Sequence, residues 1–230
     1  MATAELAVIV CARDEEERLG ATLDALRRVA FPGARLLVAD DGSRDATASV
    51  ALQHGAQVVS TGRPIGKGGA ATLAARTLLE DHDPAIVVLC DGDLGTSAAR
   101  LAPLAQTVRD GRCDVAIGAF ARRVGGGFGL ALSTSRAIVR RAGGLRVEAP
   151  LSGQRALSAD ALRAVLPFAP RFGMETGMTI DAARAGLRIR EIELDLEHRA
   201  TGRTLRGFAH RARQLADILA VGAARVRSRA

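Results

Sequence analysis

Short apolar runs alternate with polar turns and helical segments along the first half of the chain. Runs of this length and composition are typical of strands that lie buried in a parallel sheet. They fall at residues 6–11, 35–39, 57–59, 86–90 and 115–119. Between them leucines recur at helical spacing, as at Leu19, Leu23 and Leu26. The alternation predicts a single α/β domain with a Rossmann-like, mostly parallel central sheet and helices on both faces.

The second half of the chain carries a different pattern. Helices are predicted at 133–141, at 160–166 and in a segment that ends at Ala185. The glycine-rich stretch 122–129 predicts a flexible loop, and 148–157 is predicted to lead into the helix that follows it. From Leu187 to His198 apolar and acidic residues alternate. This alternation predicts a strand, with His198 on its apolar side.

The last stretch, 205–226, combines many arginines with helical spacing of apolar residues. Its apolar side is predicted to carry Phe208, Leu215, Ile218 and Leu219. A basic amphipathic helix of this kind can pack on its own domain, join two subunits as a homodimer, or lie on an anionic membrane. We predict packing on the domain or on a partner subunit, with peripheral membrane contact as the alternative.

Composition is that of an ordinary globular protein. The chain has 230 residues, of which 48% are hydrophobic and 25% charged, so it can bury one substantial core. No apolar run approaches the roughly 20 residues that span a bilayer. The three cysteines are odd in number and form no CxxC pair. Since they sit in or beside apolar runs, we expect reduced, buried thiols in a cytoplasmic protein without a secretion signal.

The formal net charge of +7 points to an anionic partner. Nucleic acid is not the expected one, because the chain has no Trp or Tyr and only six Phe with which to stack bases. Phosphorylated small molecules and anionic lipids remain. Lys67 is the only lysine among the basic residues and stands in a glycine-rich loop, Gly66-Lys67-Gly68-Gly69.

That loop is predicted to begin a helix, where exposed N–H groups and the helix dipole attract anions. It is not a Walker A motif, since Thr61 stands at the first glycine position and Gly68 follows the lysine. The first strand is not followed by a Rossmann glycine fingerprint either. We predict that Lys67 contacts a phosphate, the alternative being an ordinary surface lysine.

Acidic side chains follow three of the predicted strands, where each strand ends. They are Asp14 and Glu15, then Asp40 and Asp41, then Asp91 and Asp93. Open α/β sheets bind their ligands at this carboxyl edge. Asp91 and Asp93, two residues apart, would present their oxygens together to a hard cation such as Mg²⁺ or Mn²⁺, which in turn holds phosphate. The alternative for each acid is a polar turn or a helix cap.

In their order along the chain, these motifs resemble those of the glycosyltransferase A fold, and specifically those of the family-2 type. The motifs are Arg13-Asp14-Glu15-Glu16, Val38-Ala39-Asp40-Asp41-Gly42-Ser43, Gly66-Lys67-Gly68-Gly69-Ala70 and Asp91-Gly92-Asp93. The second half is similar to a narrower group that includes the glucosyl-3-phosphoglycerate synthases, on Phe172-Gly173-Met174-Glu175-Thr176-Gly177 and on Glu197-His198-Arg199. The resemblance implies a catalytic domain over 1–204, with a nucleotide-sugar half (1–118) and an acceptor half (119–204), and a separate basic helix over 205–230.

The resemblance also implies a role for each candidate residue on the donor side. Nucleotide-sugar contacts would come from Asp14 and Glu15 at the ribose, Asp40 at a uracil-type base, Lys67 at the base or diphosphate, and Asp91 with Gly92. Asp93 and His198 would hold Mg²⁺ or Mn²⁺, which stabilises the departing diphosphate as a Lewis acid.

A further set is implied on the acceptor side. It consists of Gly153, Gln154 and Arg155 in one loop, with Arg199 and Arg203. In inverting members a carboxylate deprotonates the acceptor hydroxyl, and Glu175 or Asp181 is the candidate for that role. In the phosphoglycerate-type enzymes the configuration is retained and no such base is evident, so both outcomes stay open.

We therefore expect a metal-dependent glycosyltransferase that moves a hexose, with glucose as the expected sugar, from a UDP-sugar. The acceptor would be a phosphorylated small molecule or a polyprenyl phosphate. A nucleotidyltransferase is one alternative, although such enzymes usually carry a basic glycine-rich loop where this chain has an acidic turn. A nucleotide-binding module without catalysis is the other, and the intact Lys67, Asp93 and His198 speak against it.

Overall fold

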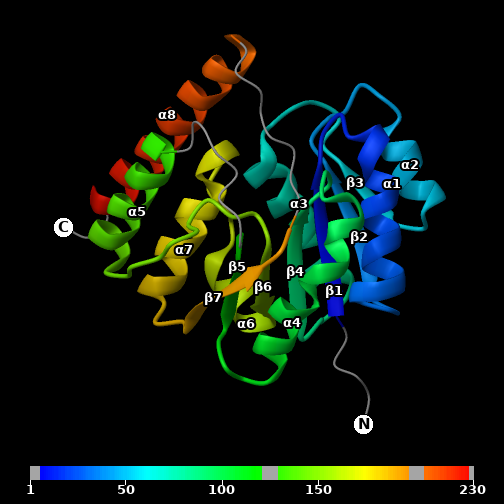
Figure 1. Ribbon diagram of the computed structural model, residues 1–230, viewed down its shortest axis with the longest axis horizontal. Coiled ribbons are helices and arrows are strands. Elements are labelled where there is room, and N and C mark those ends of the chain that lie inside the picture. Colours follow the sequence, from blue (N-terminus) through cyan, green and yellow to red (C-terminus); the bar gives the residue numbers. More distant parts are fainter. Residues whose placement is uncertain (1–5, 121–128, 197–204, 228–230) are drawn as a thin grey trace.

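The structure is a computed structural model, and it describes residues 6–120, 129–196 and 205–227. Strands of the described part form one seven-stranded sheet in the order β3-β2-β1-β4-β6-β5-β7 (Figure 1). They are β1 (Leu6–Ala12), β2 (Arg35–Asp40), β3 (Gln57–Ser60), β4 (Ile86–Asp91), β5 (Val115–Phe120), β6 (Arg155–Ser158) and β7 (Ile189–Leu194). All neighbours pair in parallel except β6, which is antiparallel to both β4 and β5. The predicted mostly parallel sheet in a single α/β domain is confirmed.

Strand β6 is the element that the sequence analysis missed. Its four residues, Arg-Ala-Leu-Ser, are too few to show a period, and the segment was expected only to lead into a helix. Pairing of Leu89 with Arg155 and of Ala116 with Ala156 places β6 between two longer strands. Tertiary pairing of this kind, which local propensity does not reveal, decides the conformation of so short a segment.

Helices fill the connections between the strands. They are α1 (Glu16–Ala25), which continues as a π-helical turn η1 (Leu26–Ala30), α2 (Thr47–Gln53), α3 (Lys67–Asp81), the 3₁₀ segment η2 (Gly95–Leu101), α4 (Ala102–Arg109), α5 (Gly129–Gly143), α6 (Ala159–Val165), the 3₁₀ turn η3 (Arg171–Gly173), α7 (Met174–Arg184) and α8 (Leu205–Arg227). None of the helices in the described ranges is long and apolar enough to cross a bilayer.

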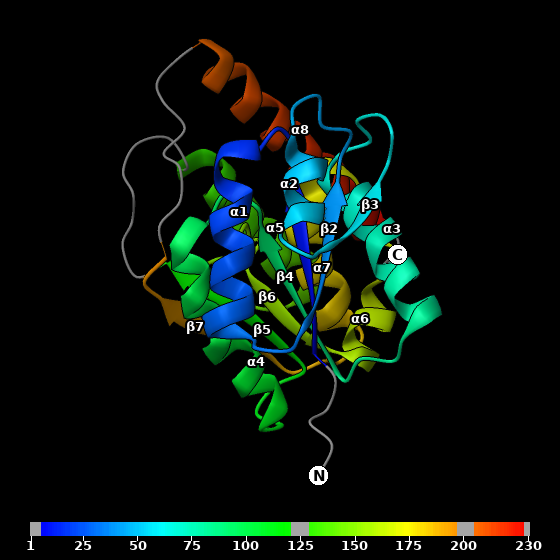
Figure 2. The ribbon, with the colours of Figure 1, turned by 90° about the vertical axis from the view of Figure 1, so that its right-hand side faces the viewer.

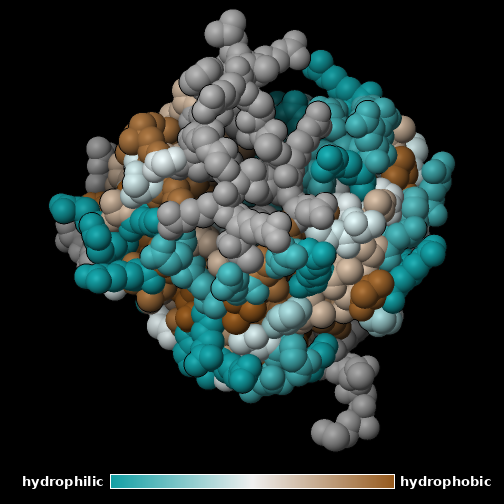
Figure 3. Space-filling model, in the orientation of Figure 1, coloured by the Kyte–Doolittle hydropathy of each residue, from teal (hydrophilic) through white to brown (hydrophobic). Residues whose placement is uncertain are grey.

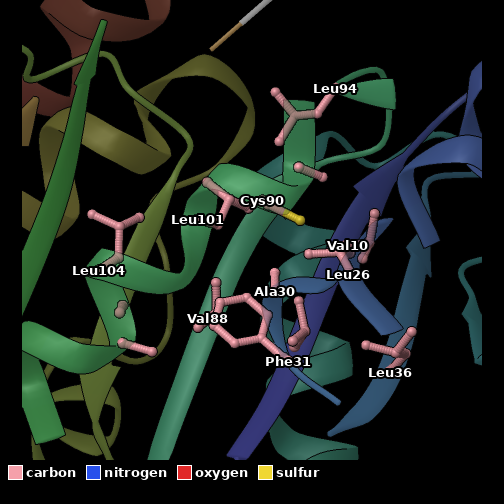
Figure 4. Close-up of a cluster of buried hydrophobic side chains, with 14 of the residues drawn as sticks. Val10, Leu26, Ala30, Phe31, Leu36, Val88, Cys90, Leu94, Leu101 and Leu104 are labelled. Atoms are coloured by element: carbon pink, nitrogen blue, oxygen red, sulfur yellow. The ribbon is translucent and has the colours of Figure 1, made fainter. Parts of the chain in front are cut away.

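The core lies on both faces of the sheet because successive strand residues point to opposite sides. On one face Val10 and Val88 pack with side chains of α1, η1, η2 and α4, including Phe31 (Figure 4). On the other face Ile9 and Leu89 pack against α3, α6 and α7. The sheet therefore forms the middle layer of three, and Figure 2 shows α1 and α3 on its two sides.

Helix α8 packs on the same chain, against α5, α7 and η3 (Figure 1). Ile218 and Val221 form its buried face, and Arg225 pairs with Asp181 of α7. Leu219, which was expected on the apolar packed side, is instead 51% exposed, since the packed face is rotated toward Val221. Hydrophobic side chains are visible at this side of the molecule in Figure 3, where α5 and α8 lie in Figure 1.

Candidate active site

The carboxyl ends of β1, β2 and β4 meet at one edge of the sheet, as the sequence predicted. Ala12 pairs with Asp40 on one side of β1, and Cys11 pairs with Asp91 on the other. The two acidic strand ends therefore flank the end of β1. In open α/β sheets this is the edge at which ligands bind.

Lys67 occupies the centre of this edge. As the first residue of α3, it directs its Nζ between two carboxylates, 2.5 Å from Asp91 Oδ1 and 2.6 Å from Glu175 Oε1. Glu175 lies in the first turn of α7, and its side chain is only 8% exposed. The three residues, which we call the lysine cluster, join the first half of the chain to the second half.

The lysine cluster is charged at neutral pH. Burial acts to lower the pKa of Lys67, but the carboxylates of Asp91 and Glu175 outweigh it and raise that pKa well above its ordinary value. Beneath them, burial raises the pKa of Cys11 to about 12. The thiol therefore stays protonated, and Lys67 stays charged.

Gly153 and Gln154 lie against this cluster. Gln154 Nε2 donates to Asp91 Oδ2 at 2.7 Å, and the backbone N–H of Asp91 donates to Gln154 Oε1 at 3.1 Å. A Cβ on Gly153 would lie 2.5 Å from Lys67 Nζ, so glycine leaves the space that the ammonium needs. The resemblance implied acceptor contacts for both residues, and the structure places them against the donor-side carboxylate.

Arg155, the third residue of that loop, is 1% exposed and does not face the edge. Its guanidinium donates to the carbonyls of Ser152 at 3.0 Å and Pro150 at 3.1 Å and to Thr179 Oγ1 at 3.0 Å. Burial lowers its pKa to about 10. A side chain enclosed in this way cannot touch an acceptor directly, which corrects the implied role. Arg155 instead holds the loop in shape from inside.

Arg155→Met is expected to lower the free energy of unfolding by about 3 kcal/mol, because three buried acceptors lose their donor. Urea unfolding followed by circular dichroism measures the change. Arg155→Lys keeps a positive charge but not the planar fork, and we expect it to recover less than half of the loss. Equal stability of the methionine variant and the wild type would contradict this role.

Asp91 is the last residue of β4, and Asp93 follows it after one glycine. Asp91 is held by Lys67 and Gln154, whereas Asp93 lies in the turn after β4 and is half-buried. Between them Gly92 donates its N–H to Cys11 O at 2.9 Å, and a Cβ there would lie 3.1 Å from the Cβ of Ala12. The described ranges contain no group of three or more His, Cys, Asp or Glu side chains that could hold a metal by themselves. Expected site residues His198, Arg199 and Arg203 lie outside the described residues.

Asp40, expected at a nucleobase, is 3% exposed. One of its carboxylate oxygens accepts hydrogen bonds from the N–H and the hydroxyl of Ser43, at 3.0 and 2.5 Å, and the other accepts from Ser60 Oγ at 2.8 Å. These bonds fix the turn after β2. The carboxylate therefore shapes the edge where the sequence analysis placed a nucleobase.

Asp14 and Glu15 border a hollow of about 220 Å³ at the same edge. The backbone N–H of Asp14 donates to Ser43 Oγ at 3.0 Å, and that of Glu15 donates to Thr47 Oγ1 at 2.8 Å. The two acidic turns after β1 and β2 are thus tied together, and they leave room for a small polar group. A separate hollow of about 370 Å³, lined in part by Arg27 and Arg35, lies at the opposite edge of the sheet.

Asp41, which the sequence places among the acids at this edge without a separate role, fixes a neighbouring loop. Its Oδ1 accepts from the N–H groups of Ile65 at 2.7 Å and Gly66 at 2.8 Å, and it is 6% exposed. These bonds fix the loop before α3 and so set the position of Lys67. The signal was present in the sequence as a second consecutive aspartate, which an ordinary capped turn does not explain.

Asp181, the second candidate base, lies away from the lysine cluster. Its Oδ1 accepts from Arg225 Nε at 2.7 Å, and its other oxygen accepts from the same guanidinium. It follows Glu175 by six positions in α7, a spacing that turns the two side chains to different faces of the helix. The geometry brings Glu175, and not Asp181, to the edge.

Comparison with known proteins gives this geometry its context. Residues 7–158 match the model of glycosyl transferase family 2. The chain belongs to this family. It is 33% identical over 211 residues to the undecaprenyl-phosphate mannosyltransferase of Micrococcus luteus, a match that covers 84% of each chain.

Solved structures support the same assignment. Glucosyl-3-phosphoglycerate synthase from Mycobacterium tuberculosis, in complex with phosphoglyceric acid, superposes with a TM-score of 0.80 at 28% identity, covering 98% of this chain and 81% of that one. The same enzyme in complex with Mg²⁺ and uridine diphosphate gives a TM-score of 0.80 at 27% identity, covering 98% and 80%. The predicted family, the glycosyltransferase A fold and the enzyme class are confirmed, and this glycosyltransferase depends on a nucleotide-sugar donor. Membership of a glycosyltransferase family argues against the alternative that the protein is a nucleotidyltransferase.

Proposed function

We propose that this glycosyltransferase moves glucose from a UDP-sugar to an acceptor that carries a phosphate group, with Mg²⁺ or Mn²⁺ at Asp93. The lysine cluster is the observation that carries the proposal, because it joins Asp91 of the donor half to Glu175 of the acceptor half. Transfer requires that both substrates bind at one place. Here charged side chains from both halves of the chain lie at the same edge of the sheet. The related enzyme in complex with Mn²⁺, UDP-glucose and phosphoglyceric acid supports these substrate classes.

The ligand atoms proposed at this edge fit a divalent cation. Mg²⁺ is usually held by one or two carboxylates together with substrate phosphates, and it keeps several waters. Asp93 supplies a carboxylate directly after β4, and His198 is the proposed second ligand. When bound, the ion acts as a Lewis acid on the departing diphosphate. Lys67 adds a fixed positive charge close to where that negative charge develops.

Glu175 is the proposed base for an acceptor that reacts through a hydroxyl group. Its carboxylate lies at this edge, 2.6 Å from Lys67 Nζ, where the two substrates would meet. An acceptor that reacts through a phosphate oxygen is already deprotonated at neutral pH and needs no base. Glu175→Gln therefore separates the two acceptor types, because it would impair inverting transfer to a hydroxyl group more than transfer to a polyprenyl phosphate.

Thermal-shift measurements with UDP, GDP and CMP, each with and without Mn²⁺, test the donor. We expect stabilisation by UDP that depends on Mn²⁺, since a ligand that binds only the folded state raises the melting temperature. Indifference to every nucleotide would overturn the proposed function. Stabilisation by GDP alone would exclude the UDP-sugar.

Asp93→Ala is expected to abolish the Mn²⁺-dependent part of the UDP shift and to leave the melting temperature of the unliganded protein within about 2 °C, as expected for a partly exposed side chain. Asp110→Ala removes a carboxylate from the end of α4 and serves as the matched control. It should keep the full shift. Undiminished Mn²⁺ dependence in the Asp93 variant would show that another residue holds the ion.

A further inference from the structure

A buried hydroxyl group of α1 binds the turn that carries Asp93. Thr22 Oγ1 donates to the carbonyl of Gly92 at 2.7 Å and accepts from the N–H of Gly95 at 2.8 Å. Thr22 is completely buried. One oxygen atom therefore binds the backbone on both sides of Asp93, from a helix that lies beneath the turn.

The rest of this turn is fixed at its two ends. Gly92 donates its N–H to Cys11 O, and Leu94 is 3% exposed in the core. Gly95 adopts a positive φ of 55°, which suits glycine. Between these points the hydroxyl of Thr22 binds the peptide groups on both sides of Asp93, and exposed Arg18 Nη1 adds a longer hydrogen bond to the Asp93 carbonyl at 3.3 Å. Those peptide groups set the direction in which the carboxylate leaves the backbone.

We propose that Thr22 is a positioning residue for the Asp93 carboxylate, and that it sets the affinity of this edge for a divalent cation without touching the ion. The inference rests on the proposed function, in which Asp93 holds Mg²⁺ or Mn²⁺. Partners that orient a metal ligand typically change metal affinity about 10- to 100-fold when they are removed. No feature of the sequence marks Thr22, since its role depends on how α1 packs under the turn.

A purely structural role would look different. The same hydroxyl lies 3.2 Å from Arg18 O, the acceptor that a helical threonine commonly uses. A hydroxyl has one proton to donate, and Gly92 O, which is closer than Arg18 O, is the better acceptor for it. If the Thr22 hydroxyl served only the stability of the fold, valine, which has nearly the same shape, would change stability and leave metal affinity unaltered.

The experiment measures the Mn²⁺ concentration that gives half of the UDP-dependent thermal shift. We expect Thr22→Val to raise it about 10-fold and Thr22→Ser, which keeps the hydroxyl, to stay within about 3-fold of the wild type. Thr107→Val is the matched control, because Thr107 is 6% exposed and donates to Pro103 O within α4, away from the edge. It should lose stability without changing the Mn²⁺ midpoint.

Thr22→Ala repeats the comparison if the valine variant does not fold, since alanine differs from serine only by the hydroxyl. Mn²⁺ midpoints of Thr22→Val or Thr22→Ala equal to those of Thr107→Val or Thr22→Ser would overturn the positioning role while the proposed function stands. A wild type without any Mn²⁺-dependent UDP shift would instead remove the proposed function, and this inference with it.

Discussion

Lys67→Met is expected to reduce kcat/KM by about 100- to 1000-fold, the range observed when one preorganised charge is removed from a transition state. The ammonium lies between Asp91 and Glu175, so its loss leaves two neighbouring carboxylates without their shared cation. We also expect the free energy of unfolding to fall by about 2–3 kcal/mol, less than for a fully enclosed pair because the cluster is partly exposed. Steady-state kinetics and urea unfolding measure the two effects.

A double variant separates the two contributions of Lys67. Lys67→Met with Glu175→Gln removes one negative charge along with the cation, and we expect it to recover most of the lost stability. UDP binding should remain weak in the double variant if Lys67 also contacts the donor. Recovery of both properties would show that Lys67 only neutralises its neighbours.

The pH dependence of the Lys67→Met effect has a defined sign. Because the pKa of Lys67 is raised in the folded protein, its contribution is complete below the unfolded value of about 10.4 and is lost only as the pH rises through the folded value. The stability difference between variant and wild type should therefore be constant from about pH 6 to 9. It should shrink in acid, where the carboxylates are protonated in both proteins. A difference that changed steadily between pH 6 and 9 would contradict the charge state assigned to Lys67.

Gly153→Ala is expected to reduce kcat/KM about 100-fold, the scale of an ångström-sized displacement in an active site. The new Cβ would lie 2.5 Å from Lys67 Nζ and 2.7 Å from Asp91 Oδ2, closer than side-chain carbons approach such atoms. Both atoms are ends of side chains, so they move and the backbone stays. We therefore expect a stability loss of only about 1 kcal/mol. Kinetics and thermal unfolding of the same preparation test the separation.

Two glycines provide matched controls for Gly153. Gly129 faces open space, and Gly129→Ala should leave both kinetics and stability unchanged. At Gly68 a Cβ would lie 1.9 Å from the backbone oxygen of Ala169, so Gly68→Ala should cost stability first. Full activity of Gly153→Ala would show that the lysine cluster tolerates displacement.

The edge of the sheet could be predicted from the sequence because buried strands and the acids that end them are local features. The runs before Asp40 and Asp91 are continuous and apolar. The segments between the predicted strands show the spacing of helices, which favours helical connections between parallel strands. Which residues meet across that edge could not be predicted. Lys67 and Glu175 are 108 positions apart, and their contact depends on how α3 and α7 pack.

Arg155 shows why side-chain roles are harder to predict than edges. An arginine in a polar loop resembles a ligand for an anionic substrate, and nothing local shows that its partners are carbonyl groups of the same loop. The same holds for Asp181, whose partner Arg225 comes from the last helix. In both cases contacts that form only after the chain has folded decide the role.

The reversed direction of β6 has a consequence for which parts of the chain meet at this edge. Since β6 runs against β4, the segment that enters it reaches the same edge as Asp91, and the pairing of Leu89 with Arg155 continues to Gly153 beside that aspartate. A parallel strand in this place would deliver its entry segment to the far edge. The direction of one short strand therefore brings residues from the second half of the chain to the edge where β1, β2 and β4 end.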